Sequence, residues 1–413
     1  MTRRALFGVP FAAALTAASR DWDVDIEQLT HGPKHHFFGY IGHVKNTPWN
    51  GSGRYMVLLR TGFQDHMPAP SEAAEVALID TQQRNAVAVI DQSRAWNPQQ
   101  GTMFYWNPKA ADTQLIFNDR DLKTNHVFPV LYDISRRKRI KEYRYDDTPL
   151  GNSGVAQNGG YFLGLNYGRL ARLRSVTGYP GAYDWSKDVA APENDGIFLV
   201  EIESGRKRLL VSFRQLAELV ATKRADIGGK HLFINHTLWN REDNRIYFYV
   251  RGDFDAKQGK VDVPCTMKPD GSGLTMLARF IGGHPEWEFG SRAIGDVGGK
   301  QILYDVDKQE IVGQIGTPEI LPQPGGDSAL SPDGKWFVNG YRVGHDDFYA
   351  IIRRDDGSYL RTRGLPVDGW TGGDLRLDPA PCWNRTSDVI AVPAVADDRE
   401  RTRQTFLLRI RKR

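Results

Sequence analysis

Two histidines and an aspartate occur at similar places in three successive segments of the chain. His236 lies in Ile234-Asn235-His236-Thr237-Leu238-Trp239, His284 in Gly282-Gly283-His284-Pro285-Glu286-Trp287, and Asp327 in Gly325-Gly326-Asp327-Ser328. Imidazole nitrogen and carboxylate oxygen are the ligands that zinc takes in proteins, and manganese or calcium accepts part of the same set. We therefore predict a divalent metal, zinc in the first place, at His236, His284 and Asp327. The alternative is that each side chain only hydrogen-bonds the backbone of its own segment.

A second group of polar residues lies upstream and suits β-elimination from a uronic acid. It comprises His126, Tyr167, Arg169, Arg174 and Tyr179. An arginine can pair with the sugar carboxylate through two charge-assisted hydrogen bonds and so ease removal of the neighbouring C5 proton. A tyrosine or histidine can take that proton and return one to the leaving oxygen. The alternative to this catalytic interpretation is that the arginines form salt bridges and that His126 has only a structural role.

Other catalytic patterns find little support. The sequence contains no G-x-S-x-G elbow, P-loop, G-x-G-x-x-G fingerprint or H-E-x-x-H helix. A pair of carboxylates could still hydrolyse a glycoside, with Glu286 and Asp327 as the first candidates. Cys265 and Cys382 lie far apart without the spacing of a metal or redox site.

These residues need a scaffold, and a weak repeat supplies one. A small or aromatic residue, a turn with Asn, Asp or Gly and then an alternating apolar strand recur about seven times, the later copies roughly 45 to 50 residues apart. The copies begin near Trp49, Trp106, Gln157, Trp239, Trp287, Ser331 and Trp383. Because this is the length of a four-stranded blade, the pattern predicts an all-β, seven-bladed β-propeller as one domain over residues 20–413. The one clear amphipathic helix is expected at Phe213 to Arg224.

The N-terminus predicts export. Two arginines, Arg3 and Arg4, precede an apolar stretch from Gly8 to Ala18 that is too short to span a bilayer. Residues 1–19 are thus expected to be a signal peptide of twin-arginine type, and the mature chain a soluble, monomeric periplasmic or secreted protein with no membrane segment. The 54 basic and 50 acidic residues leave a net charge of +4, too small a surplus for a nucleic-acid partner. The basic run Arg136 to Arg139 is interpreted as a solvated strand end.

Several stretches resemble the propeller polysaccharide lyases that act on oligogalacturonate or ulvan. The similar stretches are Trp96 to Gly101, Leu115 to Asp119, Leu163 to Leu170 with Gly178-Tyr179, Ile234 to Val250, Gly282 to Trp287 and Asp327 to Gly334. The resemblance implies a metal near His236 and His284 with Asp327 as partner, and elimination carried by His126 and the segment from Tyr167 to Tyr179. The chain departs from the family at Trp106-Asn107 and at Asp378-Pro379, where relatives carry histidine.

The sequence alone thus favours an exported polysaccharide lyase that cleaves an acidic polysaccharide or oligosaccharide by β-elimination. Two alternatives remain open at this point. The first is a periplasmic propeller that binds a glycan or a partner protein without chemistry. The second is the two-carboxylate glycoside hydrolase.

Overall fold

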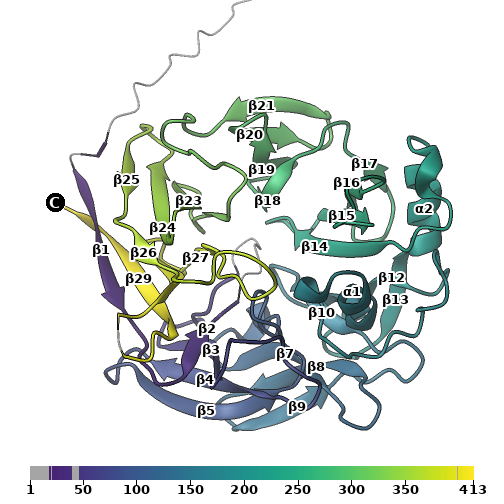
Figure 1. Cartoon of the computed structure of the whole chain (residues 1–413), viewed down its shortest axis with the longest axis horizontal. Helices are drawn as coiled ribbons and strands as arrows, with labels where there is room; N and C mark the ends of the chain where they lie inside the picture. The colour runs from purple at the N-terminus through teal and green to yellow at the C-terminus, as the bar shows by residue number, and fades with distance from the viewer. Residues whose placement is uncertain (1–17, 20, 40–45, 398) are drawn as a thin grey trace, which may run out of the picture.

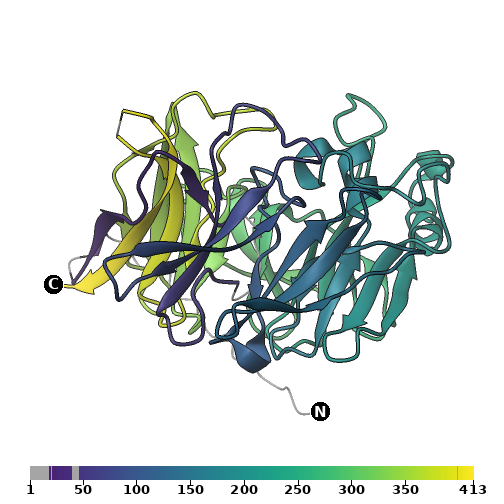
Figure 2. The ribbon, with the colours of Figure 1, turned by 90° about the horizontal axis from the view of Figure 1, so that it is seen from below.

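The computed structural model describes residues 18, 19, 21–39, 46–397 and 399–413. Its strands form seven antiparallel sheets that are arranged in a ring around a central axis (Figure 1). The prediction of a seven-bladed, all-β propeller is therefore confirmed. Seen from the side, the blades pack face to face and their connecting loops gather at the two ends of the ring (Figure 2).

Each blade begins with a strand near the central axis and ends with a strand at the rim. Blade 1 has β2 (His35–Phe37), β3 (Tyr55–Thr61), β4 (Ala74–Asp80) and β5 (Ala86–Ser93), and blade 2 has β6 (Tyr105–Trp106), β7 (Gln114–Arg120), β8 (Val127–Asp133) and β9 (Lys138–Glu142). Blade 3 has β10 (Gly151–Val155), β11 (Tyr161–Leu165), β12 (Gly196–Glu201) and β13 (Lys207–Ser212), and blade 4 has β14 (Phe233–Trp239), β15 (Ile246–Gly252), β16 (Val261–Met267) and β17 (Thr275–Met276). Blade 5 has β18 (Gly282–Trp287), β19 (Arg292–Val297), β20 (Lys300–Asp305) and β21 (Glu310–Gln314). Blade 6 has β22 (Ser328–Leu330), β23 (Trp336–Val343), β24 (Asp346–Arg353) and β25 (Tyr359–Arg361), with β26 (Leu365–Pro366) also paired to β24, and blade 7 has β27 (Cys382–Trp383), β28 (Val389–Val395), β29 (Arg403–Lys412) and β1 (Trp22–Gln28).

Blade 7 combines the two ends of the chain. The N-terminal strand β1 pairs antiparallel with the C-terminal strand β29, from Trp22 opposite Lys412 to Gln28 opposite Phe406. Backbone hydrogen bonds between distant parts of the sequence therefore close the ring. The predicted signal peptide falls mainly on residues 1–17, outside the described residues.

The repeated turn of the sequence is the hairpin between the innermost strand of a blade and its second strand. Its aromatic residue also joins neighbouring blades. The indole nitrogen of Trp239 donates to the carbonyl of Gly154 at 3.1 Å, that of Trp287 to Leu238 at 3.0 Å, and that of Trp383 to Ala329 at 3.0 Å. Each acceptor lies on the innermost strand of the preceding blade, so the repeat ties each of these blades to the one before it.

The hydrophobic core lies between the blades. Between blades 6 and 7, Val338 and Ile351 are buried in one cluster with Ile390 and Val392. Between blades 5 and 6, Phe337 belongs to a cluster with Ile294. Alternating side chains of each sheet are thus buried against the next blade, as the strand periodicity predicts.

Over the described residues, two α-helices lie between the strands. Helix α2 (Phe213–Ala221) confirms the predicted amphipathic helix, and Ser212 caps it in a capping box with Gln215. Helix α1 (Tyr167–Leu173) is not expected from the sequence and lies in the long connection between β11 and β12, at the end of the ring where the innermost strands begin. The described residues include no helix long and apolar enough to cross a membrane, and Cys265 and Cys382 are both free thiols.

Candidate functional site

His284 and Asp327 form a close pair where blades 5 and 6 meet. His284 Nδ1 lies 2.6 Å from Asp327 Oδ1, and the carboxylate side chain is only 2% exposed. The two segments approach closely because Gly283, at a φ of +73°, leaves no room for a Cβ, which would lie 2.6 Å from Gly325. Burial disfavours the charged imidazole, but the Asp327 carboxylate outweighs it and raises the pKa of His284.

His236 lies beside this pair on β14. Its φ of +57° accompanies a bulge, at which the register of β14 against β15 shifts between Asn235 and Leu238. The His236 and His284 rings meet edge to face with centroids 5.3 Å apart. The three residues predicted as metal ligands are therefore brought together by the fold.

Their geometry does not form a recognisable metal centre. Over the described ranges, no group of three or more His, Cys, Asp or Glu side chains could hold a metal ion. His284 Nδ1 faces Asp327 rather than an open position. The divalent metal stays a prediction.

Further contacts lead from His236 to the second strand of blade 4, β15, and to the loop that follows it. The ring of Tyr249 lies 5.9 Å from that of His236, and the guanidinium of Arg251 lies 4.3 Å from the centre of the Tyr249 ring. Arg251 also covers Phe254 at 4.6 Å, and Arg174 covers the same phenyl ring at 3.9 Å. We call these residues, His284, His236, Tyr249, Arg251, Phe254 and Arg174, the blade-4 row.

Arg174 ends the row and is only weakly paired. Among the described residues it forms an ion pair only with Asp255, at 3.5 Å, and the Asp255 side chain is 80% exposed, whereas that of Arg174 is 17% exposed. Its Nε is buried, with no hydrogen-bond partner in the part of the chain that the structure describes. Burial lowers the pKa of Arg174, and the positive charges of Arg251 and Arg376 lower it further. An anionic ligand group would relieve this repulsion.

Arg169, by contrast, is fully engaged inside the protein. It is 1% exposed, and its guanidinium donates to the carbonyls of Leu232 at 2.6 Å, Ala190 at 2.6 Å and Val189 at 3.2 Å. It also donates to the Ser186 hydroxyl at 3.0 Å. These bonds fasten the connection that follows α1 to the start of blade 4, so the structure places Arg169 in a structural position.

Tyr167 and Tyr179 are also buried. Their rings stack with centroids 4.3 Å apart, the Tyr167 hydroxyl donates to the carbonyl of Asn152 at 3.0 Å, and Asn118 donates to the Tyr179 hydroxyl at 2.8 Å. Burial raises the pKa of both phenols above the ordinary value. Tyr167 and His236 line one small cavity of about 20 Å³, which has room for about one water molecule.

His126 lies apart from the row. It follows the turn between β7 and β8, and its ring lies 4.9 Å from that of Tyr183, which is 45% exposed. Of the five residues predicted for elimination, only Arg174 belongs to the blade-4 row.

Sequence reasoning missed a strap that crosses this end of the ring. The connection from β26 to β27 (residues 367–381) reaches blade 3, where Ser175 donates to Asp374. Within the strap, Arg376 donates to Asp378 at 2.8 Å and to the side chain of Gln99 at 3.1 Å. Burial, together with the charge of Asp327, raises the pKa of Asp378. The strap therefore brings Arg376 close to Arg174.

Glu286, the first hydrolase candidate, lies in the interior. It is 2% exposed and accepts a hydrogen bond from the backbone of Trp287 at 2.8 Å. Burial raises its pKa to about 7, although the charge of Arg241 opposes that shift. A carboxyl held this way has no open face for a glycoside.

Comparisons with known proteins support the fold. No family model and no curated protein matches the sequence. Among solved structures, prolyl endopeptidases are similar with a TM-score of 0.53 at 6% identity, over 91% of this chain and 47% of that one. The Cps50 (Swd1) propeller domain of Myceliophteria thermophila reaches 0.45 at 12% identity over 90% and 98% of the two chains, and TolB of Acinetobacter baumannii reaches 0.40 at 13% over 76% and 64%.

At 6% identity, the likeness to the endopeptidases shows a shared fold alone. The chain spans about half of the endopeptidase chain and less than two thirds of the TolB chain. None of the three is a polysaccharide lyase, so the resemblance to that family stays a prediction.

Proposed function

We propose that this chain is an exported propeller that binds an acidic oligosaccharide at the blade-4 row. A carboxylate of the ligand would pair with Arg174, and its sugar rings would lie against the aromatic side chains of Phe254 and Phe280. Phe280 is 49% exposed and lies 6.0 Å from Tyr249, within reach of the same ligand. The observation that carries the proposal is the weakly paired guanidinium of Arg174 among further cations.

Binding without chemistry suits the buried residues better than elimination does. The guanidinium of Arg169 donates hydrogen bonds to backbone carbonyls, and the hydroxyls of Tyr167 and Tyr179 are hydrogen-bonded inside the protein. A general base must reach the proton that it removes. We therefore expect the segment from Tyr167 to Tyr179 to support the site, with Arg174 as its only residue in contact with the ligand.

One observation favours a second candidate, the lyase. A histidine oriented by a carboxylate is a common general base, and His284 with Asp327 at 2.6 Å has this arrangement. In that case His284 rather than a tyrosine would exchange the proton, with Arg174 on the sugar carboxylate.

Titration calorimetry with a trigalacturonate tests the proposal. We expect binding that weakens as salt rises and that is lost with the methyl-esterified ligand, because the attraction is to the carboxylates. Arg174→Ala should weaken binding about tenfold or more, since hydrogen bonds to charged groups contribute about 1.5–3 kcal/mol. Arg174→Lys, which keeps the charge, should lose less.

The control is Arg172→Ala, two residues away, whose side chain pairs with Asp184 at 2.8 Å instead of facing the row. Equal affinity of the Arg174 and Arg172 variants for the ligand would contradict the proposal, as would indifference to esterification. A rise in the ultraviolet absorbance of an unsaturated uronate, abolished by His284→Gln, would instead establish the lyase.

A further inference from the structure

The outer edge of blade 1 is unusual among the blades. Its strand β5 begins with five apolar residues, Ala86 to Ile90, and Val87 and Val89 are 43% and 48% exposed. Long apolar edge strands attract other chains, and proteins normally protect them with charges or keep them short.

The outer strands of the other blades are protected in those ways. Strands β9 and β1 carry charged residues along their length, β13 begins with Lys207 and Arg208, and β17 and β25 have two and three residues. Strand β21 also exposes Ile311 and Val312, but Glu310 and Gln314 flank them. Strand β5 thus combines length with an uncharged apolar edge.

A groove of about 640 Å³ runs along β5 between blades 1 and 2. Leu78, Tyr132 and Ile134 line it together with Ala86 to Ile90. Strand β5 is hydrogen-bonded to β4 on one side and ends the sheet on the other. The groove therefore offers apolar side-chain contacts next to a strand edge.

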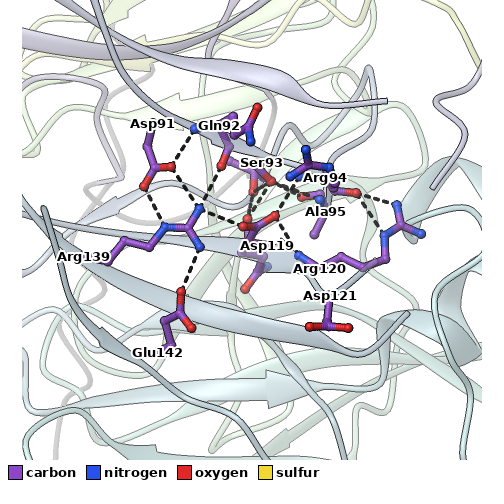
Figure 3. A network of polar contacts seen from close by, with 12 residues as sticks. Asp91, Gln92, Ser93, Arg94, Ala95, Asp119, Arg120, Asp121, Arg139 and Glu142 are labelled. Atoms are coloured by element: carbon purple, nitrogen blue, oxygen red, sulfur yellow. Dashed lines mark hydrogen bonds and ion pairs between the residues drawn. The ribbon is translucent and has the colours of Figure 1, made fainter. Parts of the chain in front are cut away.

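An ionic network lies next to β5 just after Ile90, the last β5 residue that lines the groove (Figure 3). Arg139 contacts Asp91 at 2.8 Å, Asp119 at 2.7 Å and Glu142 at 2.9 Å. Arg139 also donates to the carbonyl of Gln92 at 3.1 Å, and Tyr132 donates to that of Ile90 at 3.0 Å. Since these acceptors are used within the protein, the stretch of β5 from Ala86 to Val89 remains for pairing.

The other end of the groove is basic. The turns before β5 and before β9 both join the third and fourth strands of their blades and so lie on the same side of the ring. The turn on blade 2 carries Arg136 and Arg137, both exposed, with Lys138 following, whereas Arg84 on the blade 1 turn lines a different cavity, together with Arg385 and Arg409. Arg137 lines the groove, and Arg136 has a 3.7 Å contact to Asp133. Asp80 and Asp112 also line the groove, but Asp80 is paired with Arg54 at 2.8 Å, so the exposed Arg136, Arg137 and Lys138 leave this end basic. A basic end favours a negatively charged partner.

We propose that β5 and this groove accept an extended, acidic segment of another polypeptide, which adds to blade 1 as a further strand. Backbone hydrogen bonds to Ala86–Val89 would hold the segment, as in other cases of strand addition. Alternate apolar side chains would enter the groove, and acidic residues at one end would face Arg137 and Lys138. The site is separate from the blade-4 row and does not depend on its function.

Fluorescence anisotropy with a labelled peptide of sequence EEVTVTV tests this proposal on the full chain. We expect saturable binding, at least tenfold weaker for the Val89→Lys variant, because a charge would replace an apolar contact. Arg137→Glu should weaken binding several-fold, and the peptide QQVTVTV should bind more weakly than EEVTVTV. Ile311→Lys, on the other exposed outer strand, is the matched control and should bind as the wild type does.

Both Val89 and Arg137 are exposed, so thermal unfolding of these variants should match that of the wild type. Absence of saturable binding would overturn the proposal, and so would equal binding by the Val89→Lys and Ile311→Lys variants. Sedimentation experiments could instead show that the protein self-associates and that Val89→Lys abolishes this self-association. The occupant of the groove would then be a second copy of this chain, and the proposal of an acidic peptide segment would be overturned.

Discussion

Replacing Arg169 by methionine should destabilise the propeller by about 3–5 kcal/mol, because each buried acceptor that loses its donor costs about 1–3 kcal/mol. The variant would leave the carbonyls of Leu232, Val189 and Ala190 without their donor in the interior. It would also remove the guanidinium that lies 4.4 Å from the centre of the Phe213 ring. Urea unfolding followed by tryptophan fluorescence measures the loss.

Arg172→Met is the matched control on the same helix. The Arg172 side chain is 34% exposed and pairs with the buried carboxylate of Asp184, which Asn166 and Ser186 also bond. Its loss should therefore cost about 1–2 kcal/mol, less than the loss of Arg169. If Arg169→Met unfolded at the same urea concentration as the wild type, its buried bonds would not carry stability. A stable variant that had lost ligand binding would return Arg169 to the functional role that its sequence context predicts.

The sequence predicts the scaffold well because each inner hairpin needs particular residues. At Trp239 to Arg245, the Asn240 side chain accepts from the backbones of Asn244 at 2.9 Å and Arg245 at 3.0 Å, which forces the turn. Such local requirements repeat from blade to blade, so each hairpin can be recognised from its own stretch of sequence. Helix α2 is readable for the same reason, since Phe213, Leu216 and Val220 are buried at helical spacing.

The burial of a single polar residue cannot be predicted from its local sequence in this way. Helix α1 has only seven residues and includes Gly168, so it gives too short a pattern to be recognised. Arg169 and Arg174 look equivalent in the sequence, five residues apart. Their different environments come from Leu232 and Phe254, which are distant along the chain.

The sequence therefore predicts the blade-4 row only in part. His236 and His284 are recognisable because each stands near the start of an innermost strand, and successive blades bring such positions together. Arg251 and Phe254 are missed, although they lie at or just after the end of the second strand of blade 4, on the same end of the ring. The strap residue Arg376 gives no signal, because its place depends on a loop that crosses to blade 3.

Replacing Glu286 by glutamine should change how the free energy of unfolding depends on pH. Burial raises its pKa from 4.5 to about 7 in the folded chain. Between these values the folded protein holds a proton that the unfolded chain has released, so stability falls as pH rises through that range. Glutamine cannot ionise and avoids this loss. The free energy of unfolding of Glu286→Gln relative to wild type should therefore improve by about 2–3 kcal/mol from pH 5 to pH 8, at about 1.4 kcal/mol for each pKa unit.

Comparing the variant with the wild type at each pH cancels the titration of all other groups, and His36 provides a control of opposite sign. Burial lowers the pKa of His36 to about 4, so the wild type gains stability as pH rises from 4 toward 6.5. Any advantage of His36→Gln should accordingly be greatest in acid and shrink as pH rises, whereas that of Glu286→Gln should grow. Urea unfolding at about pH 5, 6.5 and 8 separates the two trends. A constant difference between Glu286→Gln and the wild type would mean that Glu286 ionises as it does in water, and its burial against Arg241 would then carry no energetic cost.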